Sequence, residues 1–291
     1  MCSSDLQFGF NQSELDRAKA SLRSSYEQAY NERDKNESAS YAQEYLGYFL
    51  NDEASPGIAY EWRLVQQLLP GVTLADVTGL ARQRLSGEGS VVLAVMPQKD
   101  SVKVPVEADI RAALASADRV ALTPWTDSTT TRALVEKAPT PGRITGRREL
   151  PDIGVTVVTF SNGVEAWLKP TDFKNDQVAF TMYAKGGLSL ASKDDYLQAS
   201  FASGYTSLSG VGGIKALDLQ KMLAGKVAGA SAFISDSTHG ISGSAAPAEL
   251  ETALQLAYLN FTAPGDDSDA FARSEEHTSE LQSRLHLVCR L

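Results

Sequence analysis

Few residues of this chain carry the chemistry of metal binding or nucleophilic catalysis. Its histidines are His239, His277 and His286, and its cysteines are Cys2 and Cys289. A zinc site needs three or four His, Cys or carboxylate ligands at suitable spacings. His239 has no second His, no Cys and no suitably spaced carboxylate beside it in the sequence. We therefore expect His239 to lie at a loop or strand end and to bond locally or to solvent, and we name no metal ligand.

Paired carboxylates, a glycine-rich segment and two serines are the other candidates for chemistry. Asp194 and Asp195 are adjacent, and adjacent helical residues do not face each other, so we expect them to favour a helix start through its dipole. Segment 208–213 reads Leu-Ser-Gly-Val-Gly-Gly and lacks the Lys-Ser/Thr of a P-loop. We interpret it as a flexible turn, with the alternative that it admits a substrate backbone. Ser207 and Ser209 have no His-Asp arrangement nearby to activate them.

Basic and acidic side chains alternate along the first expected helix. They are Lys19, Arg23, Glu27, Glu32 and Arg33. Charges spaced in this way are typical of a solvated face with pairing between successive turns. The alternative is that the basic residues grip peptide carboxylates. The sequence thus names no catalytic, cofactor-binding or metal residue.

Both ends of the chain resemble sequence of foreign origin. Residues 273–283 (Arg-Ser-Glu-Glu-His-Thr-Ser-Glu-Leu-Gln-Ser) resemble a translated sequencing-library adapter, and residues 2–6 resemble the complementary adapter in another frame. The alternative for the C-terminal stretch is a polar helical tail. We expect residues 1–6 and 273–291 to be adapter artefacts, as in an expression scar, and this interpretation sets aside both cysteines and two of the three histidines.

Composition excludes some classes of protein. The 291 residues are 43% hydrophobic and 22% charged, which is typical of a soluble globular protein. A net charge of -9 argues against a nucleic-acid-binding surface, which needs clustered Lys and Arg. No apolar run approaches the roughly 20 residues that cross a bilayer. The start of the chain shows no signal-peptide pattern.

Residues 13–117 predict several helices and one strand. A helix is expected from Ser13, which can act as N-cap with Asp16 three residues later. Further helical stretches are expected at 42–49, 62–69, 74–85 and 110–117. Thr73, with Asp76 three residues on, predicts another N-cap. The β-branched run 91–95 predicts a strand buried on both faces or beneath helices.

The second half predicts strands grouped with helices. Segment 123–146 is rich in Pro, Gly, Ser and Thr and is expected to be a connector. Asn162-Gly163 between two apolar runs predicts a hairpin. The other expected elements are strands at 155–160, 164–168, 177–183, 227–234 and 240–244, and helices after Ser192, at 217–223 and from Pro247. This grouping favours an α+β class: repeated two-layer domains, each with an antiparallel-rich sheet packed against helices, joined by an irregular connector.

Short motifs in a fixed order resemble one family. They are the segments 13–19, 32–35, 68–73 and 92–97, followed after the connector by 160–164 and 184–187. The first four resemble the second repeat domain of pitrilysin/insulinase peptidases, and the last two resemble the opening of that family's next repeat. The resemblance covers most of residues 11 to 265. It implies that 7–100 is part of the second repeat domain, 101–150 the inter-domain connector, and 151–272 part of the third repeat domain.

The resemblance also implies an activity for the whole protein. Family members are bi-lobed peptidases of four related α+β domains that close around an unfolded peptide. Their zinc lies in the first domain, on a helix with the H-x-x-E-H motif. In the third repeat this motif should fall on the helix after Gly187, yet residues 194–204 contain no His and no Glu. We therefore expect a degenerate repeat that holds no zinc.

These implications define the expected function. The chain is expected to be a non-catalytic internal fragment of a zinc endopeptidase, forming a hinge and chamber wall for an extended peptide that binds by strand addition. Zinc is expected in an upstream domain, and the remainder of the same polypeptide is the other expected partner. The alternative is a non-enzymatic family member that acts as a scaffold or peptide-binding protein. Absence of native cysteine suits the bacterial periplasm and is equally compatible with the cytoplasm, and of the two we expect the periplasm.

Overall fold

The computed structural model describes residues 7–84, 91–96, 102–117, 119–127, 132–270 and 272. The expected adapter segments 1–6 and 273–291 lie outside these residues. The chain divides into two compact units, Met1–Lys19 with Leu64–Ser128, and Ala20–Arg63 with Thr129–Leu291. Within the described part of the chain, no helix is long and apolar enough to span a membrane.

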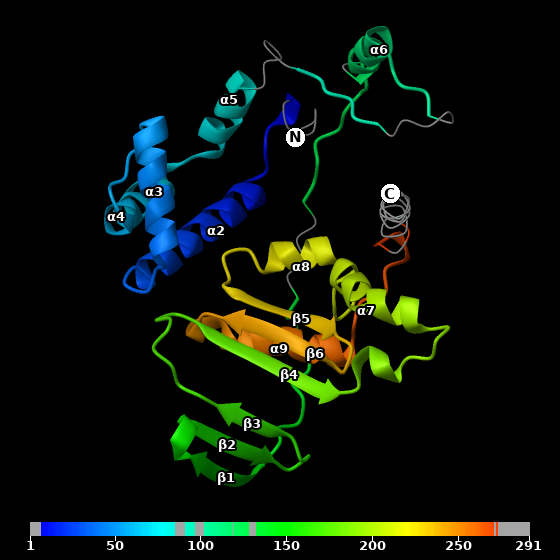
Figure 1. The fold of residues 1–291 in the computed structure, drawn as a ribbon. Coiled ribbons are helices and arrows are strands. Elements are labelled where there is room, and N and C mark those ends of the chain that lie inside the picture. The colour runs from blue at the N-terminus through cyan, green and yellow to red at the C-terminus, as the bar shows by residue number, and fades with distance from the viewer. Residues whose placement is uncertain are drawn as a thin grey trace, which may run out of the picture. The chain divides into compact units, whose positions relative to one another are not determined.

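The expected helices of the first half are confirmed (Figure 1). They are α2 (Gln12–Asn31), α3 (Ser38–Asn51), α4 (Ile58–Leu68), α5 (Leu74–Arg84) and α6 (Glu107–Ala117). Before α5, the Thr73 hydroxyl accepts a hydrogen bond from the Asp76 N–H at 3.2 Å, and the Asp76 carboxylate accepts one from the Thr73 N–H at 2.9 Å. This reciprocal pair confirms the expected cap at Thr73.

The prediction that Ser13 caps the first helix is wrong. Helix α2 begins one residue earlier, at Gln12, and the N–H of Asn11 donates to the Glu14 carboxylate at 2.8 Å. The Ser13 hydroxyl instead donates to Asp127 at 2.7 Å. A long-range acceptor therefore competes for the hydroxyl, and this competition is invisible in the local sequence.

The prediction of a buried strand at 91–95 is also wrong. Residues 91–96 belong to no helix or strand, and Val91 and Val95 are 91% and 84% exposed. A strand needs a hydrogen-bonded neighbour, and no described strand pairs with this segment. An apolar run by itself specifies a preference for burial and no pairing partner.

The second unit contains a first small sheet of antiparallel strands in the order β1-β2-β3. Its strands are β1 (Ile144–Leu150), β2 (Val155–Phe160) and β3 (Glu165–Leu168). The Asn-Gly hairpin between β2 and β3 is confirmed, with Gly163 at φ +83°, a conformation that glycine adopts without steric cost. Strand β1 was not expected, because its residues were assigned to the connector 101–150.

A second antiparallel sheet has the order β4-β6-β5, so that β6 is central (Figure 1). Its strands are β4 (Val178–Lys185), β5 (Ala228–Ile234) and β6 (Thr238–Ala245), and its helices are α7 (Tyr196–Ser209), α8 (Ala216–Met222) and α9 (Leu250–Thr262). Helix α9 packs on β5 and β6 and buries Ala253, Leu256 and Ala257. The expected α+β class, with antiparallel sheets packed against helices, is confirmed.

The start of α9 makes stability depend on pH. The Lys226 ammonium and the Thr252 hydroxyl each donate to Glu249 Oε2 at 3.0 Å, and the Lys226 hydrogen bond is the main cause that lowers the pKa of Glu249 below its usual 4.5. A carboxylate with a lowered folded-state pKa adds stability above its unfolded pKa, and this contribution is lost as pH falls through the folded pKa. Glu249→Gln should therefore reduce the loss of unfolding free energy that occurs as pH falls below the usual carboxyl pKa of 4.5. Urea titrations of both proteins at several pH values measure the free energy of unfolding. If it fell equally with pH in both proteins, the expectation would be contradicted.

Candidate functional site

Helix α7 occupies the place where the resemblance puts a zinc helix. Asp194 and Asp195 lie at its start as expected, and the Asp195 N–H donates to the Ser192 hydroxyl at 3.1 Å. The Ser192 hydroxyl also donates to the Asp195 carboxylate at 2.7 Å, so Asp195 and Ser192 form a reciprocal pair at the helix start. Nowhere in the described ranges do three or more His, Cys, Asp or Glu side chains form a group that could hold a metal ion.

His239 hydrogen-bonds to a residue 52 positions away in the sequence, where a bond to nearby residues or to solvent was expected. It lies on β6, and its Nδ1 accepts from the Gly187 N–H at 3.1 Å. Since Nδ1 is the acceptor, the proton of the neutral ring is assigned to Nε2. Gly187 has φ +59°, and a Cβ there would lie 2.1 Å from the Ser235 carbonyl oxygen. His239 therefore fastens a tight turn between β4 and α7.

The turn expected in segment 208–213 is present after the end of α7, where Gly212 and Gly213 form a turn bridged by Val211 and Ile214. The Gly212 N–H donates to the Ala263 carbonyl at 2.8 Å, and Val211 exchanges backbone bonds with Ile214. Val211 and Ile214 are each 4% exposed. The segment is thus a hydrogen-bonded corner that supplies side chains to the core. Its glycines permit close backbone approach, and the pattern Gly-x-Gly-Gly gives no sign of the buried contacts.

The remaining candidates are the two serines and the charged residues along α2. Ser207 donates to the Ser203 carbonyl at 3.0 Å, one turn back in its own helix, and Ser209 is buried.

Of the charged residues along α2, Arg23 and Glu27 are exposed as expected. Glu32 is not on a solvated face, because it is only 7% exposed and accepts a hydrogen bond from the Asp176 N–H. The spacing of charges does not predict this burial, because the residue that contacts Glu32 is Asp176, which is 144 positions away.

Among the described strands β4 pairs with β6 alone, and its other edge, called the free edge below, is the feature most suited to binding an extended peptide. In an antiparallel pair, alternate residues bond to the neighbouring strand and the others face away. The Gly186 N–H donates to the Ser237 carbonyl at 2.7 Å, and the register pairs Ala184 with His239. Even-numbered residues of β4 therefore face β6. The backbone groups of the odd-numbered residues face outward: Ala179, Thr181, Tyr183 and Lys185.

The opposite edge, β5, is less open. The Ser235 N–H donates to the Thr238 carbonyl at 2.8 Å, so the even-numbered residues of β5 face outward by the same alternation. One of them, Ala230, already accepts a hydrogen bond from Asn260 of α9 at 3.4 Å. Helix α9 and helix α7 also pack against β5. The sequence could not show which strand is the edge, because the order β4-β6-β5 does not follow the chain order.

Known proteins resemble this chain in sequence and in fold. A "Zinc protease PQQL-like" protein of Arabidopsis thaliana is 33% identical over 254 residues, which is 87% of this chain and 24% of that protein. The crystal structure of the periplasmic protease PqqL from Escherichia coli has a TM-score of 0.52 and 16% identity, over 99% of this chain and 32% of that chain. The ferredoxin protease FusC, solved in complex with Arabidopsis ferredoxin, has a TM-score of 0.47 and 19% identity, over 82% of this chain and 27% of that chain. No protein-family model matches. The chain thus spans about a quarter of the length of its plant relative.

Proposed function

Because this chain is related to zinc proteases of the pitrilysin family, we propose that it is a non-catalytic part of a zinc-dependent endopeptidase. In this proposal it forms a hinge and part of the wall of the chamber that holds the peptide. Residues 7–100 are part of the second repeat domain, 101–150 the connector, and 151–272 part of the third repeat domain. The observation that supports it most is the sequence of α7, which has no His and no Glu from residue 194 to residue 204.

The wall binds substrate through the free edge of β4 in this proposal. An extended peptide that pairs with an exposed strand gains main-chain hydrogen bonds without requiring a particular sequence. Ala179, Thr181, Tyr183 and Lys185 offer outward backbone donors and acceptors by the alternation described above. A peptide added there extends the sheet beyond β4.

Zinc and the cellular compartment follow from the same proposal. The whole protein holds zinc in a different domain, which supplies the activated water for hydrolysis. We place the whole protein in the bacterial periplasm ahead of the cytoplasm, with support from the periplasmic location named for PqqL. Its substrates are proteins or peptides in extended form.

Metal content and the upstream gene sequence together test this function. We expect the purified chain, incubated with zinc and desalted, to retain far less than one zinc per chain and to leave unstructured peptides uncut. Its melting temperature should be the same with and without a chelator. Stoichiometric zinc, or hydrolysis that a chelator abolishes, would overturn the non-catalytic role.

Sequencing the genomic locus through both ends of the reading frame tests the second part. A continuing frame with H-x-x-E-H upstream is the expected result. A continuing frame that has lost this motif would replace the peptidase with a scaffold or peptide-binding protein. A frame that ends where this chain ends would contradict the adapter interpretation of residues 1–6 and 273–291.

A further inference from the structure

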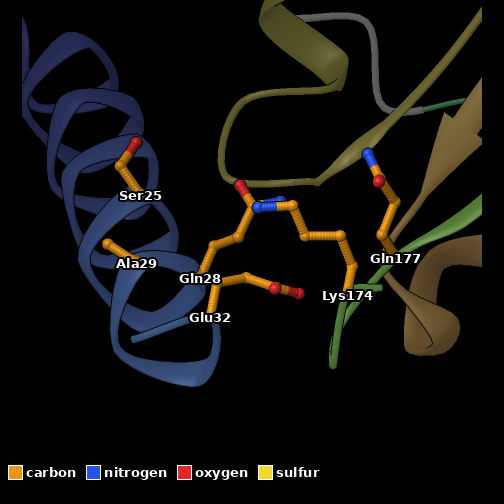
Figure 2. A pocket seen from close by; sticks show the side chains of 6 residues that line it. All are labelled: Ser25, Gln28, Ala29, Glu32, Lys174 and Gln177. Atoms are coloured by element: carbon orange, nitrogen blue, oxygen red, sulfur yellow. The ribbon is translucent and has the colours of Figure 1, made fainter. Parts of the chain in front are cut away.

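A pocket of about 270 Å³ lies where the C-terminal half of α2 faces the segment that leads into β4 (Figure 2). Its lining residues are Ser25, Gln28, Ala29, Glu32, Lys174 and Gln177. All six belong to the same compact unit. Ligand pockets for whole small molecules usually measure roughly 300–1,000 Å³, so this one suits the end of a side chain better than a cofactor.

Hydrogen bonds hold the two walls of the pocket together. The Asp176 N–H donates to Glu32 Oε1, and the Asn31 amide donates to Asp176 Oδ2 at 2.9 Å. The Asn175 amide donates to the Asn31 carbonyl at 2.9 Å and also bonds to Asp34. Segment 174–177 is thereby fixed against the end of α2. The pocket is a built feature with a defined wall on each side.

Glu32 is the group that indicates a ligand. The residue is 7% exposed, and its second carboxylate oxygen, Oε2, is buried without a hydrogen-bond partner among the described residues. A buried carboxylate oxygen without a donor is costly. Figure 2 shows the carboxylate directed away from α2 toward Lys174. The Lys174 ammonium donates to the Lys35 carbonyl at 3.4 Å and has no hydrogen bond to Oε2.

We propose that this pocket binds the cationic end of a lysine or arginine side chain, with Glu32 Oε2 as its acceptor. An ammonium or guanidinium group forms a charge-assisted hydrogen bond with a carboxylate, which is about twice as strong as a neutral one. The Ser25 hydroxyl and the Gln28 side-chain carbonyl offer further acceptors in the lining. A single carboxylate is too few ligands for calcium or magnesium, which take six or more oxygens.

Nearby charges partly oppose one another. Lys174 lines the pocket and repels a bound cation. Asp176 and Asp34 belong to the hydrogen bonds that join the two pocket walls, and their carboxylates attract a cation. Gln177, at the rim, directly precedes Val178, the first residue of β4. We therefore name the peptide substrate as the source of the basic side chain, and this choice of source rests on the proposed function.

Titrations followed by NMR test the pocket with single-residue probes. The probes are N-acetyl-lysine methylamide, N-acetyl-arginine methylamide and, as the neutral control, N-acetyl-norleucine methylamide. We expect one of the basic probes to shift the amide signals of residues 25–32 and 174–177, while norleucine shifts none. Glu32→Gln keeps an oxygen for the Asp176 N–H and should weaken binding about tenfold or more.

Two further variants separate a specific site from general charge. Glu251→Gln removes an exposed carboxylate of α9 that neither lines the pocket nor bonds to its walls, and it should change the affinity by less than about threefold. Lys174→Met removes the repelling charge and should strengthen binding about twofold or more. Equal binding of norleucine, no binding of either basic probe, or weaker binding by Lys174→Met would overturn the cation site. Preserved spectra of all three variants verify that they are folded.

Paired peptides identify the source. An extended peptide with one lysine should bind more tightly than its norleucine counterpart, and Glu32→Gln should remove the difference. Ala179→Pro, on the free edge of β4, should weaken both peptides and leave the lysine probe unaffected. If the lysine probe binds but the two peptides bind equally, the peptide source is wrong and the pocket still stands. Failure of the edge proposal is thus distinguishable from failure of the pocket.

Discussion

Gly210→Ala is expected to destabilise the unit that contains β4, β5 and β6 by about 3 kcal/mol or more. Gly210 has φ +86° and ψ -161°, a region that only glycine occupies without strain. An alanine Cβ would lie 2.1 Å from the Ile214 carbonyl oxygen, which already accepts the Val211 N–H. Relief would require this corner to open, and Val211 and Ile214 would then lose their buried positions.

Thermal and urea unfolding measure this effect against a matched glycine. A loss of 3 kcal/mol corresponds to a fall in melting temperature of about 6–12 °C for a unit of this size. Gly229→Ala, on β5, is the control, because nothing lies within 4 Å of its added Cβ and its φ is not positive. That variant should be neutral or stabilised by about 0.5–1 kcal/mol. A Gly210→Ala protein within about 1 kcal/mol of the parent would contradict the tight-corner interpretation.

Elements defined by local sequence could be predicted well. The Asn162-Gly163 hairpin and the Thr73–Asp76 cap depend on residues a few positions apart, and both are present. Failures occurred where a distant residue decides the outcome. The run 91–95 has the composition of a strand and lacks a pairing partner among the described strands. Strand β1 has two arginines and a glutamate, and it forms because β2 offers a complementary edge.

The candidate sites were less accessible to sequence reasoning. The isolation of His239 in the sequence predicts that it binds no zinc, and its bond to Gly187 spans 52 residues and follows only from the fold. Glu32 has the spacing of an exposed helix charge, and segment 174–177, more than 140 residues away, buries it. The sequence of a helix shows which side chains lie along each of its faces. It does not report which distant segment covers that helix.

Two alanine-to-proline substitutions on β4 are expected to separate folding from peptide binding. Ala184 faces β6, and proline there removes a ladder hydrogen bond opposite His239, at an expected cost of about 3 kcal/mol. Ala179 faces outward, opposite Ser244 in the register, and its N–H takes no part in the ladder. Proline is tolerated on edge strands in this orientation, so Ala179→Pro should cost about 1 kcal/mol or less.

Peptide binding by the two proline variants tests whether an extended peptide adds to β4. Ala179→Pro deletes an outward donor and places a ring at the edge, so it should weaken an extended peptide about tenfold or more if the peptide adds to β4. Fluorescence anisotropy of a labelled peptide measures this affinity, and urea unfolding measures the stability of both variants. Unchanged affinity in a folded Ala179→Pro protein would exclude β4 as the binding edge. Because both variants make the same exchange on one strand, a large difference between them is the effect expected of backbone N–H groups that face opposite sides of β4.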